Sequence, residues 1–459
     1  MARTASAPVA EPAVGRHASP APRASRRGGL AAMAIRQGTP ATIQALIALL
    51  VILSLAWGGF AAWTVSDHSS AAGSLAHADE PYSYDAQQLY LSIADADVTI
   101  TTSFLKDSQP VAEGQAAPSS LAARQRFRQD LISAAGYLAD LRNPSGSPQF
   151  NTAVAAIAGG MPDYYRDVAI AETEYAQGIT PAGDSSMEVA SEDAHLTLLP
   201  AAKELYQLEN NAVMASSSQA TNVTTVIVAF FVAIIAAVVL LLIQRWLVRR
   251  THRVFNVGLV VASVALLVSA LWLAGAFVVA RSDLSTAIDQ GAHPAESLAQ
   301  ASIDVQQIRG DSILNVIARS GTTSLSQDSA QLAQQVGSGS GGLLGTASSA
   351  GNAQATADLK PGISAAPGWY STNTQNYTLG TKYEYAQEQS SVINAADSGY
   401  GTVKTSVNDA LKDAQATFNS QAAAGANAFG PVEAVVIAAA LLMAFASAWG
   451  LSSRLGEYR

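Results

Sequence analysis

The chain has 459 residues, of which 49% are hydrophobic and only 13% are charged, and its formal net charge is −9. Soluble domains carry roughly 25% charged residues, so this composition predicts membrane segments diluted by water-exposed ones. The negative net charge does not favour nucleic-acid binding. The sequence contains no cysteine, which excludes disulfides, zinc–thiolate sites, iron–sulfur clusters and thiol nucleophiles.

Four stretches are apolar over the roughly 20 residues that a helix needs to cross about 30 Å of hydrocarbon. We place them at residues 41–63, 223–243, 255–280 and 432–451, and the first three contain no charged residue. The first stretch is about twice as long as the apolar region of a signal peptide, which favours an uncleaved anchor. The sequence therefore predicts an all-α, polytopic membrane protein with four transmembrane helices.

The distribution of charge predicts the orientation of these spans, because positive residues near span ends stay in the cytoplasm. Residues 1–38 form an arginine-rich segment that we expect to be a disordered cytoplasmic tail. Residues 64–221 carry 20 acids against seven Lys and Arg, and residues 282–430 carry 12 against six. We therefore expect both termini in the cytoplasm of a cell-membrane protein, with a basic cytoplasmic loop at 244–254 and a short tail at 452–459.

The two long segments outside the membrane both show helical periodicity. Residues 66–221 predict an extracytoplasmic four-helix bundle, and residues 282–430 predict a second extracytoplasmic helical domain. No proline or glycine interrupts the chain between Ala201 and Ile243, which predicts one unbroken helix from the first bundle into the second span. A stretch rich in glycine and serine at 337–351 predicts a flexible segment.

The sequence contains little that points to catalysis. It lacks the motifs G-x-x-x-x-G-K-[ST], H-E-x-x-H and G-x-S-x-G, and its six histidines are scattered without the spacing of metal ligands. No acid or base lies deep within a span, as carriers and proton relays usually require. The sequence therefore predicts a protein that is not an enzyme and needs no cofactor or metal.

Charged residues in the first bundle are candidates for ligand binding. The cluster Arg124, Arg126 and Arg128 could supply a fork of hydrogen bonds for a ligand carboxylate, and Arg124 and Arg128 are the candidates we select from it. Asp95 and Asp97 could hold an ammonium group, and the two clusters together would suit a zwitterionic amino acid. The alternative is that these charges form solvated or inter-helix ion pairs.

Aromatic residues mark two further candidate sites. Tyr164, Tyr165 and Arg166 form a possible part of the ligand site, although one tyrosine packed in the core would explain the pattern as well. Trp369 and Tyr370 lie in an aromatic-rich stretch of the second domain. Such clusters occur on partner-binding faces and also in cores.

The layout of span, outer bundle and span over residues 41–255 resembles the ligand-binding modules of bacterial chemoreceptors and sensor kinases. Those receptors continue into a HAMP linker, whereas this chain turns back into the membrane through a loop that contains Arg245, Arg249, Arg250 and Arg253. In topology nearly the whole chain resembles the actinobacterial four-span membrane protein of the glutamine-sensing pathway. That resemblance implies amino-acid sensing with an extracytoplasmic solute-binding lipoprotein, a cytosolic Ser/Thr kinase and no catalysis by this chain.

Two functions remain open from the sequence. The first is a non-enzymatic transmembrane sensor or signal transmitter, whose cytosolic partner would contact the four arginines of the 244–254 loop. The second is a cell-envelope scaffold or the mechanotransmission subunit of an ABC-type complex. The sequence is also compatible with a homodimer.

Overall fold

The structure is a computed structural model that describes residues 39–75, 80–107, 120–141, 147–251, 256–319, 323–395 and 399–455. The predicted tail at 1–38 lies outside the described residues. The described residues form helices and no strand, which confirms the predicted all-α fold. The helices are α1 (Thr39–Ser74), α2 (Glu80–Asp107), α3 (Ser120–Asp140), α4 (Pro148–Ala176), α5 (Thr180–Asp193), η2 (Ala194–Leu198), α6 (Leu199–Ala220), α7 (Thr224–Thr251), α8 (Val257–Ala287), η3 (Ile288–Ala292), α9 (His293–Ala318), α10 (Thr323–Val336), α11 (Gly342–Ala350), α12 (Ala353–Thr381), α13 (Tyr385–Ala395) and α14 (Gly401–Leu455).

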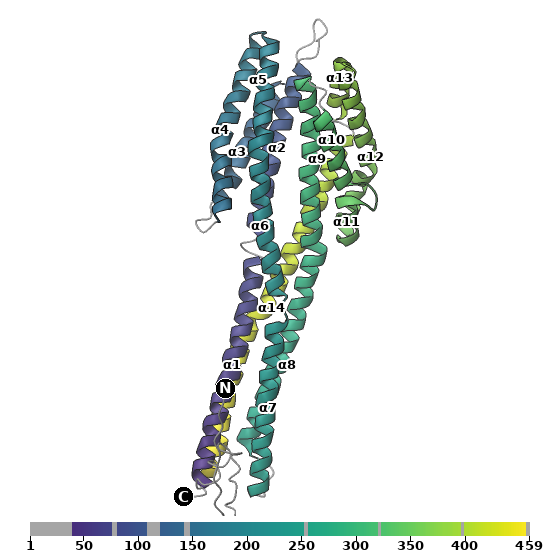
Figure 1. Cartoon of the computed structure of the whole chain (residues 1–459). Helices are drawn as coiled ribbons and strands as arrows, with labels where there is room; N and C mark the ends of the chain where they lie inside the picture. The colour runs from purple at the N-terminus through teal and green to yellow at the C-terminus, as the bar shows by residue number, and fades with distance from the viewer. Residues whose placement is uncertain are drawn as a thin grey trace, which may run out of the picture.

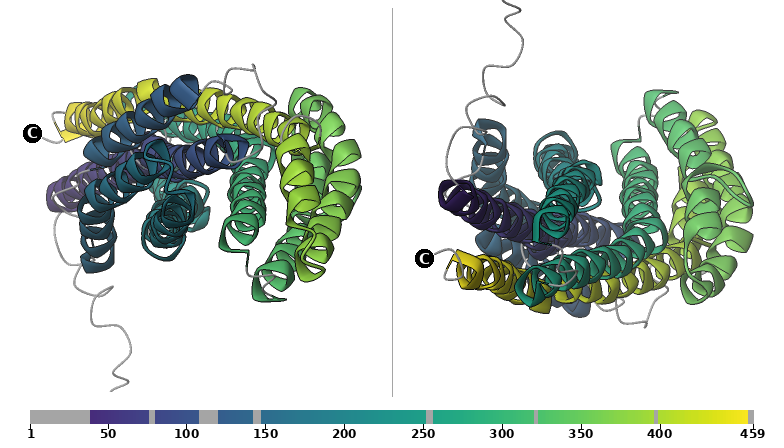
Figure 2. Two further views of the ribbon diagram at one scale, coloured as in Figure 1. Left: turned by 90° about the horizontal axis from the view of Figure 1, so that it is seen from above. Right: turned by 90° about the horizontal axis from the view of Figure 1, so that it is seen from below.

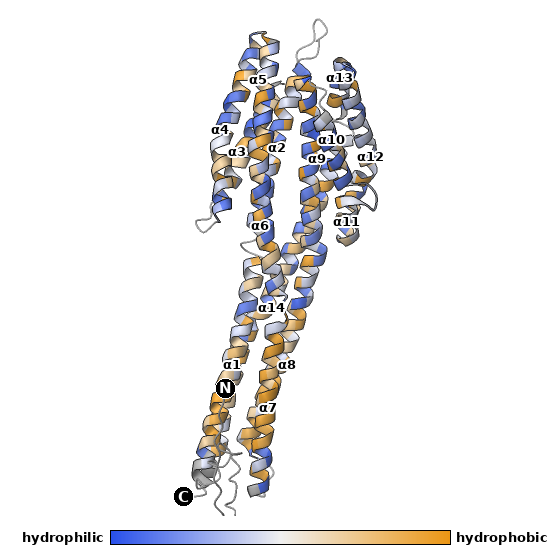
Figure 3. Ribbon diagram, viewed as in Figure 1, coloured by the Kyte–Doolittle hydropathy of each residue, from blue (hydrophilic) through white to orange (hydrophobic). Residues whose placement is uncertain are grey.

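The molecule is elongated and has two parts (Figure 1). The membrane bundle consists of α1, α7, α8 and the second half of α14, and the head contains the remaining helices and the first half of α14. In the described part of the chain, four helical stretches are long and apolar enough to cross a membrane, and they include α1, α7, α8 and α14. Their apolar residues gather in the membrane bundle (Figure 3), as a multi-pass membrane protein requires.

The two halves of the head lie side by side and share one core. From above, the helices of residues 80–220 lie on one side and those of 323–395 on the other (Figure 2). A single cluster of buried hydrophobic side chains runs through both halves, from Ile93 on α2 and Leu205 on α6 to Ile308 on α9 and Val407 on α14. The two predicted bundles are therefore packed into one body.

Helix α9 lies at the centre of the head and is buried on nearly all sides. Its polar side chains are buried too, so each needs a partner within the protein. These partners come from surrounding helices: Ser302 donates to Asn408 of α14, Asn315 to Glu388 of α13, and Gln306 to Asp95 of α2. Hydrogen bonds thus fix the rotation of α9 relative to both halves of the head.

Two helices contain one turn of π-helix directly before a proline. η2 precedes Pro200 and η3 precedes Pro294. Proline lacks a backbone N–H, and its ring clashes with the carbonyl group four residues earlier, which disfavours a regular α-helical turn. The extra residue is accommodated by a wider turn, in which the N–H of Leu199 donates to the carbonyl of Ala194.

The predicted unbroken helix from Ala201 to Ile243 is wrong. Helix α6 ends at Ala220 and α7 begins at Thr224. The side chain of Asn222 accepts a hydrogen bond from the N–H of Thr224 at 2.9 Å. Asparagine and threonine side chains compete with helical backbone hydrogen bonds in this way, so a helix ends here without proline or glycine.

The predicted flexible segment at 337–351 is also corrected, because it contains the short helix α11. Glycines with positive φ at Gly337 and Gly342 turn the chain on either side of the serine-rich loop. The side chain of Leu344 is then fully buried in the head core. Burial of one leucine side chain contributes about 1.5–3 kcal/mol, which offsets the poor helix propensity of the glycines.

Helices α8 and α14 approach each other closely at Gly258. The side chain of Asn256 caps α8 and also donates to the carbonyl of Gly450 at 2.8 Å. A Cβ atom at Gly258 would lie 2.5 Å from the Cα atom of Gly450 and closer still to the carbonyl oxygen of Ala446. Only glycine fits at this crossing.

We expect Gly258→Ala to destabilise the membrane bundle by about 1–3 kcal/mol, because the added methyl group would push α8 and α14 apart. The control is Gly275→Ala on the same helix, where a Cβ atom meets nothing within 4 Å. Gly275 lies in the interior of α8, where alanine gains about 0.5–1 kcal/mol of helix propensity, whereas Gly258 is its second residue and gains less. The packing effect is therefore read as the fall of the Gly258→Ala midpoint below that of the wild type. Thermal unfolding in detergent would measure it, and equal midpoints for the two variants would contradict the close crossing.

Candidate functional site

A buried cluster of charged residues joins the two halves of the head. His195 of η2 lies between two carboxylates: its Nε2 is 3.3 Å from Asp97 of α2, and its Nδ1 is 3.6 Å from Asp311 of α9. Asp97 also accepts hydrogen bonds at 3.1 Å from Tyr164 of α4 and Ser191 of α5. The cluster thus connects α2, α4, α5 and η2 to the central helix α9.

The surroundings of His195 keep it protonated. Burial alone would lower its pKa, but hydrogen bonds and charge from Asp311 and Asp97 outweigh burial and raise the pKa of His195 to about 10. Gly310 makes the arrangement possible, because a Cβ atom there would lie 2.6 Å from the imidazole Cε1. The result is an imidazolium shared between two acids at neutral pH.

A polar cavity of about 390 Å³ opens between α2, α3, α9 and the start of α14. This is within the range of sites for small ligands. Its lining carries one acid and four bases, together with the hydroxyl groups of Thr99, Thr102, Ser103 and Tyr400. The charged residues are Asp95, Lys106, Arg126, Arg309 and Lys404.

The charged groups of the polar cavity differ in how accessible they are to a ligand. Asp95 pairs with Lys404 and accepts a hydrogen bond from Gln306. Arg309 is nearly fully buried, donates to the carbonyl of Val392 at 2.8 Å and lies over the Tyr400 ring. Arg126 is 65% exposed at the mouth of the cavity, so its guanidinium group is accessible.

An acid near the cavity mouth has a raised pKa. Burial and the charge of Asp95 raise the pKa of Asp130 to about 6, although Arg126 and Lys404 act in the opposite direction. Asp130 lies 3.9 Å from Arg126. With this pKa, Asp130 is still mostly ionised at pH 7, and the excess of positive charge comes from the four bases of the cavity lining.

The structure brings together only some of the predicted ligand-binding residues. Asp95 and Arg126 line the polar cavity, whereas Asp97 and Tyr164 bind each other in the core. Arg124 pairs with Glu172 at 2.9 Å. It therefore makes the inter-helix ion pair that was the alternative interpretation.

The remaining candidates of the first bundle lie away from the polar cavity. Arg128 and Tyr165 line an apolar groove between α3 and α4. Arg166 lies on the surface, where it pairs with Asp163 at 2.7 Å and with Asp167 at 3.1 Å. Tyr164 is the tyrosine that packs in the core, as the alternative interpretation had it.

The predicted partner-facing residues have different environments. Arg245 and Arg249 are exposed at the end of α7. Arg253 and the side chain of Arg250 lie outside the described residues. Trp369 is only 4% exposed and packs against Tyr370 and Tyr400, so it belongs to the core. Tyr370 is partly buried and donates to the carbonyl of Gly337.

Sequence reasoning missed His195, Arg309 and Lys404. Their pairing depends on residues distant in the chain, such as the 98 positions between His195 and Asp97. One signal was available: Asp97 directly follows the apolar-stripe residue Ala96, and Asp311 lies three residues after the apolar-stripe residue Ile308, where an unpaired acid would be costly. In the described part of the chain, no three acidic, histidine or cysteine side chains are arranged to hold a metal ion.

Residues 71–218, about a third of the chain, match the family model of an actinobacterial sensor domain. The matched region contains Asp95, Asp97, Arg126 and His195. No match was found among curated proteins or among solved structures. The match supports a sensor or signalling role for this protein.

The pKa of His195 predicts how the stability of the head depends on pH. Its folded value of about 10 exceeds the value of 6.5 for free histidine. The stabilisation is therefore complete below about pH 6.5 and is lost as pH rises to 10. We expect the unfolding midpoint of the wild type to fall across this range more steeply than that of His195→Gln.

The matched control is His293→Gln, because His293 is exposed and follows the other π-turn. Thermal unfolding of the purified protein between pH 6 and 10 would measure the difference. The same pH slope in His195→Gln and in the wild type would contradict a protonated His195.

Proposed function

We propose that this protein is a non-enzymatic transmembrane sensor that relays an extracytoplasmic amino-acid signal to a cytosolic partner such as a Ser/Thr kinase. The sensor-domain match and the four candidate spans support this proposal. The signal reaches the head either by direct binding or through a solute-binding protein. The polar cavity of the head favours the direct route.

The observation that carries the proposal is the link between the polar cavity and the spans. Arg309 on α9 connects through η3 to α8, and Lys404 lies on α14. Helix α14 continues for 55 residues from the cavity through the membrane bundle, a length of about 80 Å. A ligand that shifts α14 relative to α9 would therefore move helix ends on the far side of the membrane.

The charges of the polar cavity suit a small amino acid. A ligand carboxylate would meet Arg126 and Lys106, and its ammonium group would lie towards Asp95. Asp95 already pairs with Lys404 across the two halves of the head. Competition for Asp95 would loosen this contact, which gives the ligand a way to change the packing of α14.

The cytosolic partner would bind where the membrane bundle ends. In the proposed orientation, Arg245 and Arg249 of α7 face the cytoplasm with exposed side chains. Arginine side chains recognise carboxylates and phosphates through paired hydrogen bonds. An acidic surface on a kinase would fit them.

We expect the full-length protein to bind at least one amino acid in isothermal titration calorimetry, with the affinity reduced about tenfold in Arg126→Gln. That loss corresponds to one charge-assisted hydrogen bond. The control is Arg128→Gln, which changes the same helix but faces the α3–α4 groove. Binding that is weakened by Arg128→Gln and retained by Arg126→Gln would overturn the assignment of the cavity.

We expect a Ser/Thr kinase to co-purify with the full-length protein from native membranes, and we expect Arg245→Gln/Arg249→Gln to lose it. The control is Arg281→Gln, an exposed arginine near the opposite end of the membrane bundle. Recovery of an ABC-type ATPase instead would favour the mechanotransmission function. Recovery of no cytosolic protein would contradict the relay.

A further inference from the structure

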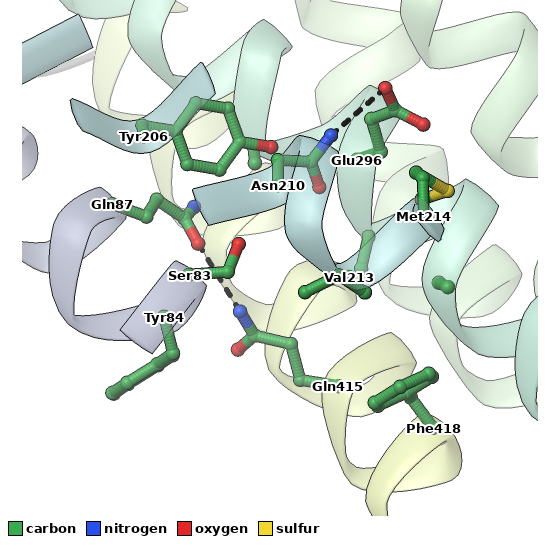
Figure 4. Close-up of a pocket in the computed structure, with 13 residues that line it drawn as sticks. Ser83, Tyr84, Gln87, Tyr206, Asn210, Val213, Met214, Glu296, Gln415 and Phe418 are labelled. Carbon is green, nitrogen blue, oxygen red and sulfur yellow. Dashed lines mark hydrogen bonds between the residues drawn. The ribbon is translucent and has the colours of Figure 1, made fainter. Parts of the chain in front are cut away.

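A second cavity lies where the head meets the membrane bundle, and we call it the junction cavity (Figure 4). Residues of α2, α6, η3, α9 and α14 line it. It is separate from the polar cavity and does not depend on the proposed function. Its volume is about 40 Å³. One water molecule needs about 10–15 Å³ by this measure, so the space suits about three waters or a ligand of about four heavy atoms.

Among the described residues, the lining of the junction cavity contains one charged side chain, Glu296, and no base. Asn210 of α6 donates a hydrogen bond to one oxygen of this carboxylate at 3.1 Å. Tyr206, Tyr84 and Phe418 add aromatic rings around the same space (Figure 4). A carboxylate among aromatic rings and without a neighbouring base favours a cationic ligand, and disfavours an anionic one.

The buried side-chain amide of Gln87 places a second requirement on a ligand of this cavity. Gln87 of α2 is only 1% exposed, and its Oε1 accepts a hydrogen bond from Gln415 of α14 at 3.2 Å. Its Nε2 has no acceptor among the described residues, and it points towards Tyr206 and Asn210 (Figure 4). Buried donors are nearly always paired, so a molecule in the cavity should offer an acceptor to this nitrogen.

We propose that the junction cavity binds a small amino alcohol, a molecule that carries an ammonium group and a hydroxyl group two carbons apart. The ammonium group donates to the carboxylate of Glu296, and the hydroxyl oxygen accepts from Nε2 of Gln87. A molecule of this class, such as ethanolamine, has four heavy atoms and matches the volume of the cavity.

The same chemistry occurs in a free amino alcohol and in the head group of a phospholipid. The position of the cavity favours the free molecule. The fourth predicted span begins directly after Pro431 of α14. Phe418 in the cavity wall lies 13 residues before Pro431 on the same continuous helix, which is about 20 Å along the helix axis. A lipid head group in the membrane would not extend over this distance.

The site has a direct mechanical connection to the membrane bundle. Ala292 belongs to the π-turn η3, and Glu296 lies in the first turn of α9 after Pro294. The π-turn η3 joins α8 to α9, so a shift of the first turn of α9 acts directly on the connection between these two helices. A ligand held between Glu296 and α2 would bias η3 and thereby the relative position of α8 and α9.

Calorimetric titration of the full-length protein in phosphatidylcholine nanodiscs would test the proposal with three probes of equal size. Ethanolamine has both groups, propylamine lacks the hydroxyl, and ethylene glycol lacks the charge. We expect ethanolamine to bind at least about tenfold more tightly than either of the other two, because each lost polar contact costs about that factor. Weakened binding of ethanolamine in phosphatidylethanolamine nanodiscs would instead assign the site to the lipid head group and overturn a free ligand.

Two variants locate the bound molecule. Glu296→Gln keeps a hydrogen-bond acceptor for Asn210 and removes the charge, so we expect it to lose ethanolamine binding by about tenfold or more. Glu192→Gln on the exposed face of α5 is the control and should bind as the wild type does. If Glu296→Gln does not fold, Gln87→Met serves in its place. Equal binding of all three probes, no binding of any, or unchanged binding in these cavity variants would overturn the proposal.

Discussion

The structure of the head depends on the protonated His195 held between Asp97 and Asp311. Three charges are buried together, and the free-energy cost of removing them from water is offset only when each charge is paired. A rotation of α2, η2 or α9 would leave a charge unpaired in the core, at a cost of several kcal/mol. Hydrophobic packing alone tolerates many arrangements of helices, whereas this triad accepts one. It therefore fixes how the two halves of the head fit together.

The sequence predicted the fold class and the presence of four spans because these depend on the length of apolar stretches, which needs no tertiary contact. It predicted the candidate site less well. Arg124, Arg126 and Arg128 are the same residue type, so the sequence does not distinguish them. Residues two positions apart on a helix face opposite sides, and only the packed structure decides which side meets α14. His195 carried no local motif, since its partners come from other helices. The helix break at Asn222 was missed because the competing side-chain hydrogen bond was given less weight than the lack of proline and glycine.

The head and the membrane bundle meet in a neck whose core is built mainly of alanine. The buried cluster there includes Ala71, Ala72, Ala287 and Ala422, with Phe418 as its one aromatic ring. Small side chains let helices approach closely and interlock little, so neighbouring helices can shift with modest loss of contact. The junction cavity lies within this neck, and its walls include Phe418 and Ala292 of the same cluster.

Helix α14 and the α6–α7 connection differ in how they preserve the angular position of the head relative to the membrane bundle. Helix α14 runs through the neck without interruption, so each residue added to it would turn everything beyond by about 100°. The joint between α6 and α7 breaks the helical screw at Thr221 and Asn222, and an added residue there only lengthens a turn. The continuous helix α14 thus fixes the rotation of its membrane part relative to its head part. The α6–α7 joint does not fix this rotation through helix geometry. Natural variation in loop length should accumulate at the α6–α7 joint and be excluded from α14.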